Sequence, residues 1–226
     1  MMLRVRWFHV NWNSNYDTVV KAVLDDIYSE GKDYGFKKNK IRNNFLSASY
    51  IQKKEIEEKI ENPLTNQTTV YQRTIFEQTM FVLENNKLGI ELINPTRNVQ
   101  SLLNTFASMS DFNITITQLN LDLLKLLKRL QYKFDKFTVQ EIECKNIEIE
   151  NGTTINLIAK NKQCDVFTDI EKFLNHKEYK VEKIKCNFQL DNLLSSFSIS
   201  RNGSLKISRQ DNDILLPILK NTILDL

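Results

Sequence analysis

The spacing of hydrophobic and polar positions changes along the chain, and the first stretch shows a strand-like pattern followed by a helical one. Residues 3–10 are rich in β-branched and aromatic side chains, a composition typical of a strand. Residues 19–28 repeat apolar side chains at helical spacing with charged side chains between them, and Gly31 follows as a stop signal. A strand followed by an amphipathic helix is therefore predicted at this end.

The middle of the chain reads as a hairpin followed by a helix and a further strand. Residues 74–83 and 87–93 have strand character on either side of Asn85-Asn86, which predicts a turn. Apolar positions in residues 99–106 recur at helical spacing. Residues 113–119 alternate Ile with Thr, as expected of a half-buried strand.

The second half is richer in strands. Asn151-Gly152 and Asn202-Gly203 lie between extended segments and predict type I′ hairpins. The remaining predicted elements are helices over residues 121–130 and 166–174 and a strand over residues 180–188. The apolar tail, residues 214–226, is expected to be a terminal helix that starts near Pro217 and packs on the body or on a partner.

Hairpins dominate this order of elements and helices are few. We therefore expect an α+β fold with mixed or mainly antiparallel sheets, β-hairpins and about four to five helices. The expected division is an N-terminal strand–helix unit with a basic segment, residues 1–62, and an α+β body, residues 63–226. The alternative is one continuous domain.

Charge adds a candidate binding surface. The whole chain carries a net charge of +3, but residues 32–54 hold seven cations against Asp33 alone. Aromatic side chains are interleaved with them, and basic and aromatic groups together suit phosphates and unpaired bases. The candidate nucleic-acid-binding residues are Lys32, Lys37, Lys38, Lys40, Arg42, Lys53, Lys54, Tyr34 and Phe36.

The conformation expected for this basic segment is irregular. Gly35 and the Asn-rich residues 39–44 favour a mobile loop, and residues 50–61 favour a short charged helix closed by Asn62-Pro63. The alternative to nucleic-acid binding is a solvated loop whose aromatic side chains enter the core.

Motifs for most enzyme classes are absent from the sequence. No glycine-rich phosphate-binding loop and no GxSxG nucleophile motif occurs, and the three cysteines show no CxxC spacing. We therefore expect no cofactor, no metal site and no catalytic residue. Two weaker candidates are His9 as a general base and the Glu143-Cys144-Lys145 triplet, with Asp122 or Asp135, as a metal-dependent nuclease site. A histidine hydrogen-bonded within the sheet explains the first candidate better, and alternating charge on the solvent face of a strand explains the second better.

Location follows from the same features. The start of the sequence lacks the apolar region of a signal peptide, and its apolar runs are too short to span a bilayer. We expect a cytoplasmic protein with reduced cysteines and no membrane partner.

The succession of residues 71–83, 87–94, 99–106, 113–119 and 137–143 resembles uncharacterised bacterial α+β proteins of phage-defence and mobile-element loci. The resemblance covers about the middle third of the chain and rests on the order of strands and helices. It implies a role as a defence component or accessory subunit, and it transfers no catalytic residue.

Together these observations favour a non-enzymatic accessory protein that binds nucleic acid or a nucleoprotein, with DNA and RNA both open as partners. One alternative is a protein–protein interaction subunit or homo-oligomer that uses exposed apolar elements. A further alternative is a cryptic metal-dependent nuclease.

Overall fold

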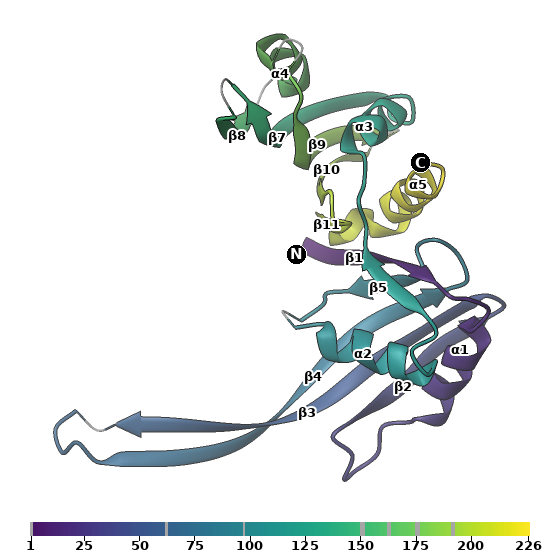
Figure 1. Ribbon diagram of the computed structural model, residues 1–226, viewed down its shortest axis with the longest axis vertical. Helices are drawn as coiled ribbons and strands as arrows, with labels where there is room; N and C mark the ends of the chain where they lie inside the picture. Colours follow the sequence, from purple (N-terminus) through teal and green to yellow (C-terminus); the bar gives the residue numbers. More distant parts are fainter. Residues whose placement is uncertain are drawn as a thin grey trace. The chain divides into compact units, whose positions relative to one another are not determined.

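The computed structural model describes residues 2–61, 63–96, 98–149, 152–161, 164–174, 177–190 and 193–226 (Figure 1). These residues form five α-helices and eleven strands whose pairing is mostly antiparallel, which confirms the predicted α+β class and its hairpins. The helices are α1 (Tyr16–Asp25), α2 (Gln100–Met109), α3 (Leu123–Gln131), α4 (Val166–Leu174) and α5 (Asn212–Leu224). The strands are β1 (Met2–Asn11), β2 (Tyr34–Arg42), β3 (Phe45–Glu61), β4 (Thr68–Glu84), β5 (Ile90–Ile93), β6 (Thr115–Gln118), β7 (Lys136–Glu148), β8 (Thr154–Lys160), β9 (Lys180–Leu190), β10 (Leu193–Ser200) and β11 (Ser204–Ser208).

The chain divides into two compact units. Val10–Ile116 forms one, here called the arm-bearing unit, and Met1–His9 with Thr117–Leu226 forms the other, here called the C-terminal unit. The division does not fall near residue 62, because β3 and β4 on either side of that position pair with each other from Phe45↔Glu84 to Glu61↔Thr68.

The arm-bearing unit is built on the antiparallel strand order β2-β3-β4-β5. An aromatic cluster joins α2 to one face of this sheet. The Phe106 ring stacks on Phe36 at a centroid distance of 6.2 Å and meets Phe81 edge-on at 5.1 Å. Helix α1 buries Tyr16, Val19 and Val23, and the Tyr16 hydroxyl donates a hydrogen bond to the carbonyl of Leu83 at 3.2 Å.

The basic segment has a different conformation from the predicted one. Residues 34–42 form β2 instead of a mobile loop, and residues 50–61 continue β3 instead of forming a helix. The Glu- and Lys-rich composition of residues 53–61 favours a helix locally, but it faces Thr, Val, Tyr and Ile of β4 across an unbroken ladder. Cross-strand pairing outweighs the local propensity.

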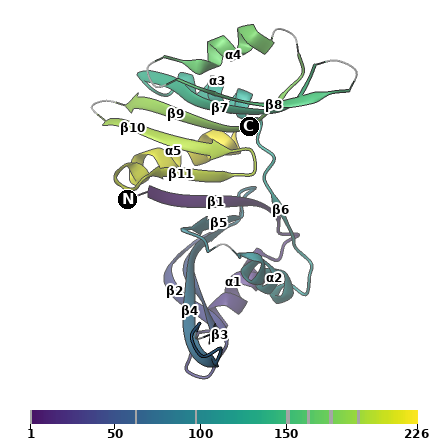
Figure 2. The ribbon, with the colours of Figure 1, turned by 90° about the vertical axis from the view of Figure 1, so that its left-hand side faces the viewer.

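The C-terminal unit follows the strand order β1-β11-β10-β9-β7-β8 (Figure 2). The Asn202-Gly203 hairpin is confirmed between β10 and β11, but its turn is not of the predicted type I′, because Gly203 has a positive φ of +79° and Asn202 does not. The Gly203 amide donates to the Ser200 carbonyl at 3.0 Å, so the turn spans residues 200–203. The other hairpin joins β7 and β8, but Asn151 of its turn lies outside the described residues.

The apolar tail starts its helix earlier than predicted. Helix α5 begins at Asn212 and contains Pro217 inside. Pro217 is the sixth residue of α5, so the helix lacks one backbone hydrogen bond there, the one to the carbonyl of Asp213. Leu215, Leu219 and Ile223 are buried, so the tail belongs largely to the core of its unit. No helix in the described part of the chain has the length and apolar character needed to cross a membrane.

Candidate nucleic-acid surface

The seven cations of the basic segment fall into two groups. Lys32 pairs with Asp26 at 2.7 Å, Lys53 with Glu55 at 3.0 Å and Lys54 with Glu77 at 2.7 Å. The hydrogen bond that the Lys53 ammonium donates to the Glu55 carboxylate raises the pKa of Lys53, because it favours the charged form. These three side chains are therefore largely neutralised by the protein's own carboxylates.

The second group, here called the β2 cations, comprises Lys37, Lys38, Lys40 and Arg42. All four are exposed, and within the described residues none of them forms an ion pair. Sequence reasoning identified all seven residues but had no means of separating the paired from the unpaired.

A β-bulge determines which way the β2 cations point. Lys38 lies opposite Ala48 and Lys40 opposite Ser47, so Asn39 is the extra residue. Plain alternation would place Lys37 and Lys40 on opposite faces of the sheet. The bulge instead puts Lys37, Lys40 and Arg42 on the face of Ser49, Ser47 and Phe45, and leaves Lys38 on the face of Ala48.

The two aromatic candidates differ in access. Phe36 is only 1% exposed and packs among Phe81, Phe106 and Tyr50, so it is a core residue and offers no surface for stacking on a base. Tyr34 is 43% exposed and lies 6.0 Å from the Tyr50 ring, centroid to centroid.

Part of the free edge of β2 is covered by the segment after α1. The Tyr28 amide donates to the Phe36 carbonyl at 3.0 Å, and the Phe36 amide donates to the Asp26 carbonyl at 2.9 Å. Ile27 and Phe36 thus form a parallel bridge. Beyond this bridge β2 remains an edge strand in the order of its sheet, and the β2 cations lie along that part.

A cavity adjoins this edge and is here called the α1 pocket. It has a volume of about 390 Å³ and combines apolar walls from α1, from the following segment and from β3 with two lysines of β2. The lining residues are Val23, Leu24, Ile27, Tyr28, Phe36, Lys37, Lys38 and Ile51. Sequence reasoning missed Ile27 and Tyr28, which it treated as helix positions; the only available signal was their position just before the basic segment.

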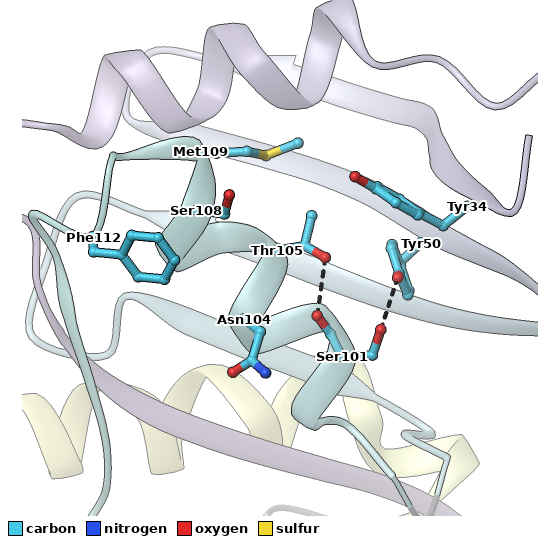
Figure 3. A pocket seen from close by; sticks show the side chains of 8 residues that line it. All are labelled: Tyr34, Tyr50, Ser101, Asn104, Thr105, Ser108, Met109 and Phe112. Carbon is cyan, nitrogen blue, oxygen red and sulfur yellow. Dashed lines mark hydrogen bonds between the residues drawn. The ribbon is translucent and has the colours of Figure 1, made fainter.

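A second cavity of about 710 Å³, here called the α2 pocket, contains Tyr34 (Figure 3). Tyr34 and Tyr50 lie at one end of it and Phe112 at the other, with hydroxyl-bearing side chains of α2 between them. The Tyr50 and Ser101 hydroxyls share a hydrogen bond of 3.1 Å. The lining residues are Tyr34, Tyr50, Ser101, Asn104, Thr105, Ser108, Met109 and Phe112, and none of them is charged.

Two of the residues considered for catalysis, Glu143 and Asp122, make ordinary structural contacts. Glu143 approaches Lys145 at 3.7 Å, and Asp122 accepts a hydrogen bond from the Lys125 amide as the cap of α3. No group of three His, Cys, Asp or Glu side chains positioned to hold a metal occurs among the described residues. Burial raises the pKa of the Cys144 thiol to about 11, which disfavours the thiolate needed for nucleophilic chemistry.

Beyond the body of the sheet, β3 and β4 continue as a two-stranded ribbon (Figure 1). We call residues 54–61 and 68–75 the β3–β4 arm. β2 pairs with β3 only from Phe45 to Gln52 and β5 pairs with β4 only from Met80 to Leu83, so in the arm each strand is paired with the other alone. The arm was not predicted from the sequence.

Neither the known family models nor the curated proteins with which the sequence was compared give a match to the chain.

Proposed function

We propose that the protein binds nucleic acid through the β2 cations and acts as a non-enzymatic accessory protein. One observation carries the proposal: four of the seven cations on the basic segment have no carboxylate partner among the described residues, and all four lie on one exposed edge strand. Unpaired ammonium and guanidinium groups gain more from phosphate than groups already neutralised within the protein.

The spacing of these groups supports the proposal. Lys40 and Arg42 are alternate positions of an extended strand, ~6.6 Å apart, and Lys37 lies on the same face on the other side of the bulge. A row of this kind can contact successive phosphates of one nucleic-acid strand. Phosphate contacts give affinity and register without base specificity, which fits an accessory role.

The test is an electrophoretic mobility shift with single- and double-stranded DNA and RNA across a salt series. Four phosphate contacts predict a slope of log affinity against log salt of roughly −3 for single strands. Changing Lys37, Lys38, Lys40 and Arg42 to Ala should abolish the shift. The matched control changes the paired Lys32, Lys53 and Lys54 to Ala and should reduce affinity only slightly. Equal losses in the two variants, or no shift with any probe at low salt, would refute the proposal.

A cytoplasmic defence component is the cellular role we propose, on the resemblance of the middle of the chain to proteins of phage-defence loci. Expression of the native chain in a bacterial host should lower phage plaque counts, and the quadruple Ala variant should restore them. Equal protection by both would separate the defence role from the β2 cations.

Self-association is a second candidate, favoured by the β3–β4 arm. Ile60 and Tyr71 are 52% and 55% exposed, and the register places them on one face of the ribbon with Ile56 and Ile75. A two-stranded hairpin is marginally stable alone in water, so this apolar face would gain from being covered. The arm, residues 54–61 and 68–75, holds four carboxylates against three cations, and these carboxylates could pair with the β2 cations of a second copy of the chain.

Light scattering on variants of the arm tests whether the arm is the contact between two copies of the chain. If the arm binds a second copy, the native chain should be a dimer, and changing both Ile60 and Tyr71 to Asn should give a folded monomer. Changing Val70, which lies on the other face of the arm, to Asn should leave the dimer intact. Since both candidate functions use the β2 cations, a bound oligonucleotide should shift the dimer toward monomer. If the native chain is a monomer, self-association through the arm is excluded.

A further inference from the structure

The α1 pocket places apolar walls directly beside the unpaired cations. Its volume of about 390 Å³ lies at the small end of ligand pockets, which span roughly 300–1,000 Å³, and suits one planar ring system. At this pocket an apolar group and negative charges can be bound together.

The walls of the pocket contain accessible apolar and aromatic side chains. Ile27 is 63% exposed, and Tyr28 and Ile51 are half-buried. The Tyr28 ring meets Phe76 edge-on at a centroid distance of 6.4 Å, a contact that limits how the ring turns. Tyr28 is also fixed through its backbone, since its amide is bound to the Phe36 carbonyl.

The rim of the pocket supplies positive charge on two sides. Lys37 and Lys38 both line it, and as successive strand residues they point to opposite faces of β2. A ring held between Ile27, Tyr28 and Ile51 would therefore have an ammonium group available to a phosphate on either side of it.

Resting on the proposed function, we infer that the α1 pocket receives one unstacked base of a single-stranded nucleic acid, with Lys37 and Lys38 binding the flanking phosphates. Bases of a duplex are paired and stacked, whereas bases of a single strand are free to stack on an aromatic side chain.

The α2 pocket is the natural comparison, because it is larger and also contains an accessible tyrosine. None of its lining residues is charged, so a base placed there would have no cation of that pocket for its phosphates. This difference makes Tyr34 the matched control for Tyr28.

The experiment measures fluorescence anisotropy of end-labelled oligonucleotides about twelve nucleotides long at low salt. The probes are oligothymidylate, oligouridylate and an abasic strand of equal length, which keeps the phosphates but has no bases. We expect the strands with bases to bind about tenfold more tightly than the abasic strand, as stacking on one aromatic side chain predicts. Tyr28→Ala should remove this advantage, and Tyr34→Ala should preserve it.

The outcomes separate the inference from the function on which it rests. Equal binding of base-bearing and abasic strands, or loss of the advantage in Tyr34→Ala alone, would overturn the base pocket and leave phosphate binding standing. Absence of binding to every probe would remove both. Tyr28→Leu keeps the apolar bulk if Tyr28→Ala fails to fold, and it should also lose the advantage.

Discussion

Gly35 lies directly beneath Tyr28, and a Cβ atom at Gly35 would be 2.6 Å from the Cα atom of Tyr28. The clash is with backbone, which the parallel bridge between Ile27 and Phe36 holds in place. Glycine is required here by close packing of two chain segments.

Gly35→Ala should therefore destabilise the arm-bearing unit by about 2 kcal/mol, the middle of the range for overpacking. It should also weaken oligothymidylate binding, since the displaced segment carries Ile27 and Tyr28 of the α1 pocket. Urea unfolding followed by circular dichroism measures the first effect and anisotropy the second. Ser47→Ala on β3 is the control and should change stability by less than about 0.5 kcal/mol. A Gly35→Ala protein as stable as the native one would show that residues 26–28 move away at little cost.

Backbone strain at the end of α2 gives a prediction of the opposite sign. Asp111 and Phe112 have φ values of +49° and +60°, in the left-handed region that disfavours side chains. The Asp111 amide donates to the Ser108 carbonyl at 3.0 Å and the Phe112 amide to the Ala107 carbonyl at 2.8 Å, so the helix closes with Asp111 in the position that usually holds glycine.

Phe112→Gly should raise the free energy of unfolding by about 1 kcal/mol, because the ring is 75% exposed and its loss removes little packing. Asp111→Gly should give a smaller gain, since Asp tolerates this conformation better than Phe. Thermal unfolding of both variants beside the native chain provides the measurement. A destabilised Phe112→Gly protein would mean that the ring contributes more through its contacts in the α2 pocket than the strain costs.

The sequence pattern predicted those elements whose signals are local. The hairpin at Asn202-Gly203 is signalled by a glycine that takes positive φ, and the helices α1 and α3 follow from apolar side chains at helical spacing. Residues 53–61 were predicted incorrectly because their strand conformation depends on β4, whose nearest residue follows only after the turn.

The sequence predicted which residues make up the candidate site, but not how they are arranged. The positive charge of residues 32–54 is visible in the sequence. Which of these cations are paired with carboxylates is not, because Asp26 and Glu77 reach Lys32 and Lys54 only in the folded chain. The extra residue Asn39 reverses the face that simple alternation assigns to the following cations. The α1 pocket arises from a parallel bridge between separate segments, for which no short-range signal exists.

Glu141 on β7 provides a pH-dependent contribution to stability. It pairs with Lys183 at 3.0 Å and with Lys160 at 3.2 Å. The hydrogen bond from Lys183 is the main cause that lowers the pKa of the Glu141 carboxyl below its usual value, with Lys160 adding to it against the opposing effect of burial. The folded state thus favours the ionised carboxylate.

Because the folded-state pKa is depressed, this stabilisation is present above the unfolded pKa of ~4.3 and is lost as the pH falls through the lower folded value. Glu141→Gln should cost about 1 kcal/mol near neutral pH, a modest figure because both lysines are partly exposed, and the cost should disappear in acid. Urea unfolding over a pH series measures this difference. Glu143→Gln, which removes a longer contact of 3.7 Å, should have a smaller effect. A pH-independent cost at Glu141 would point to packing instead of charge.

The β2 cations also have a role to be expected of any edge strand, because lysines on an edge discourage pairing with other chains. Ile41, which lies among them, is 46% exposed, so the edge without its charges would be open and partly apolar.

Changing Lys37, Lys38, Lys40 and Arg42 to Ala should therefore increase aggregation, whereas changing the same four residues to Glu should keep the edge charged and the protein monodisperse. If nucleic-acid binding is the function of these residues, the Glu variant should remain as soluble as the native chain and lose all binding. Light scattering and mobility shift on the same preparations measure both properties. A soluble Glu variant that still binds would show that the cations only protect the edge and that the nucleic acid binds elsewhere.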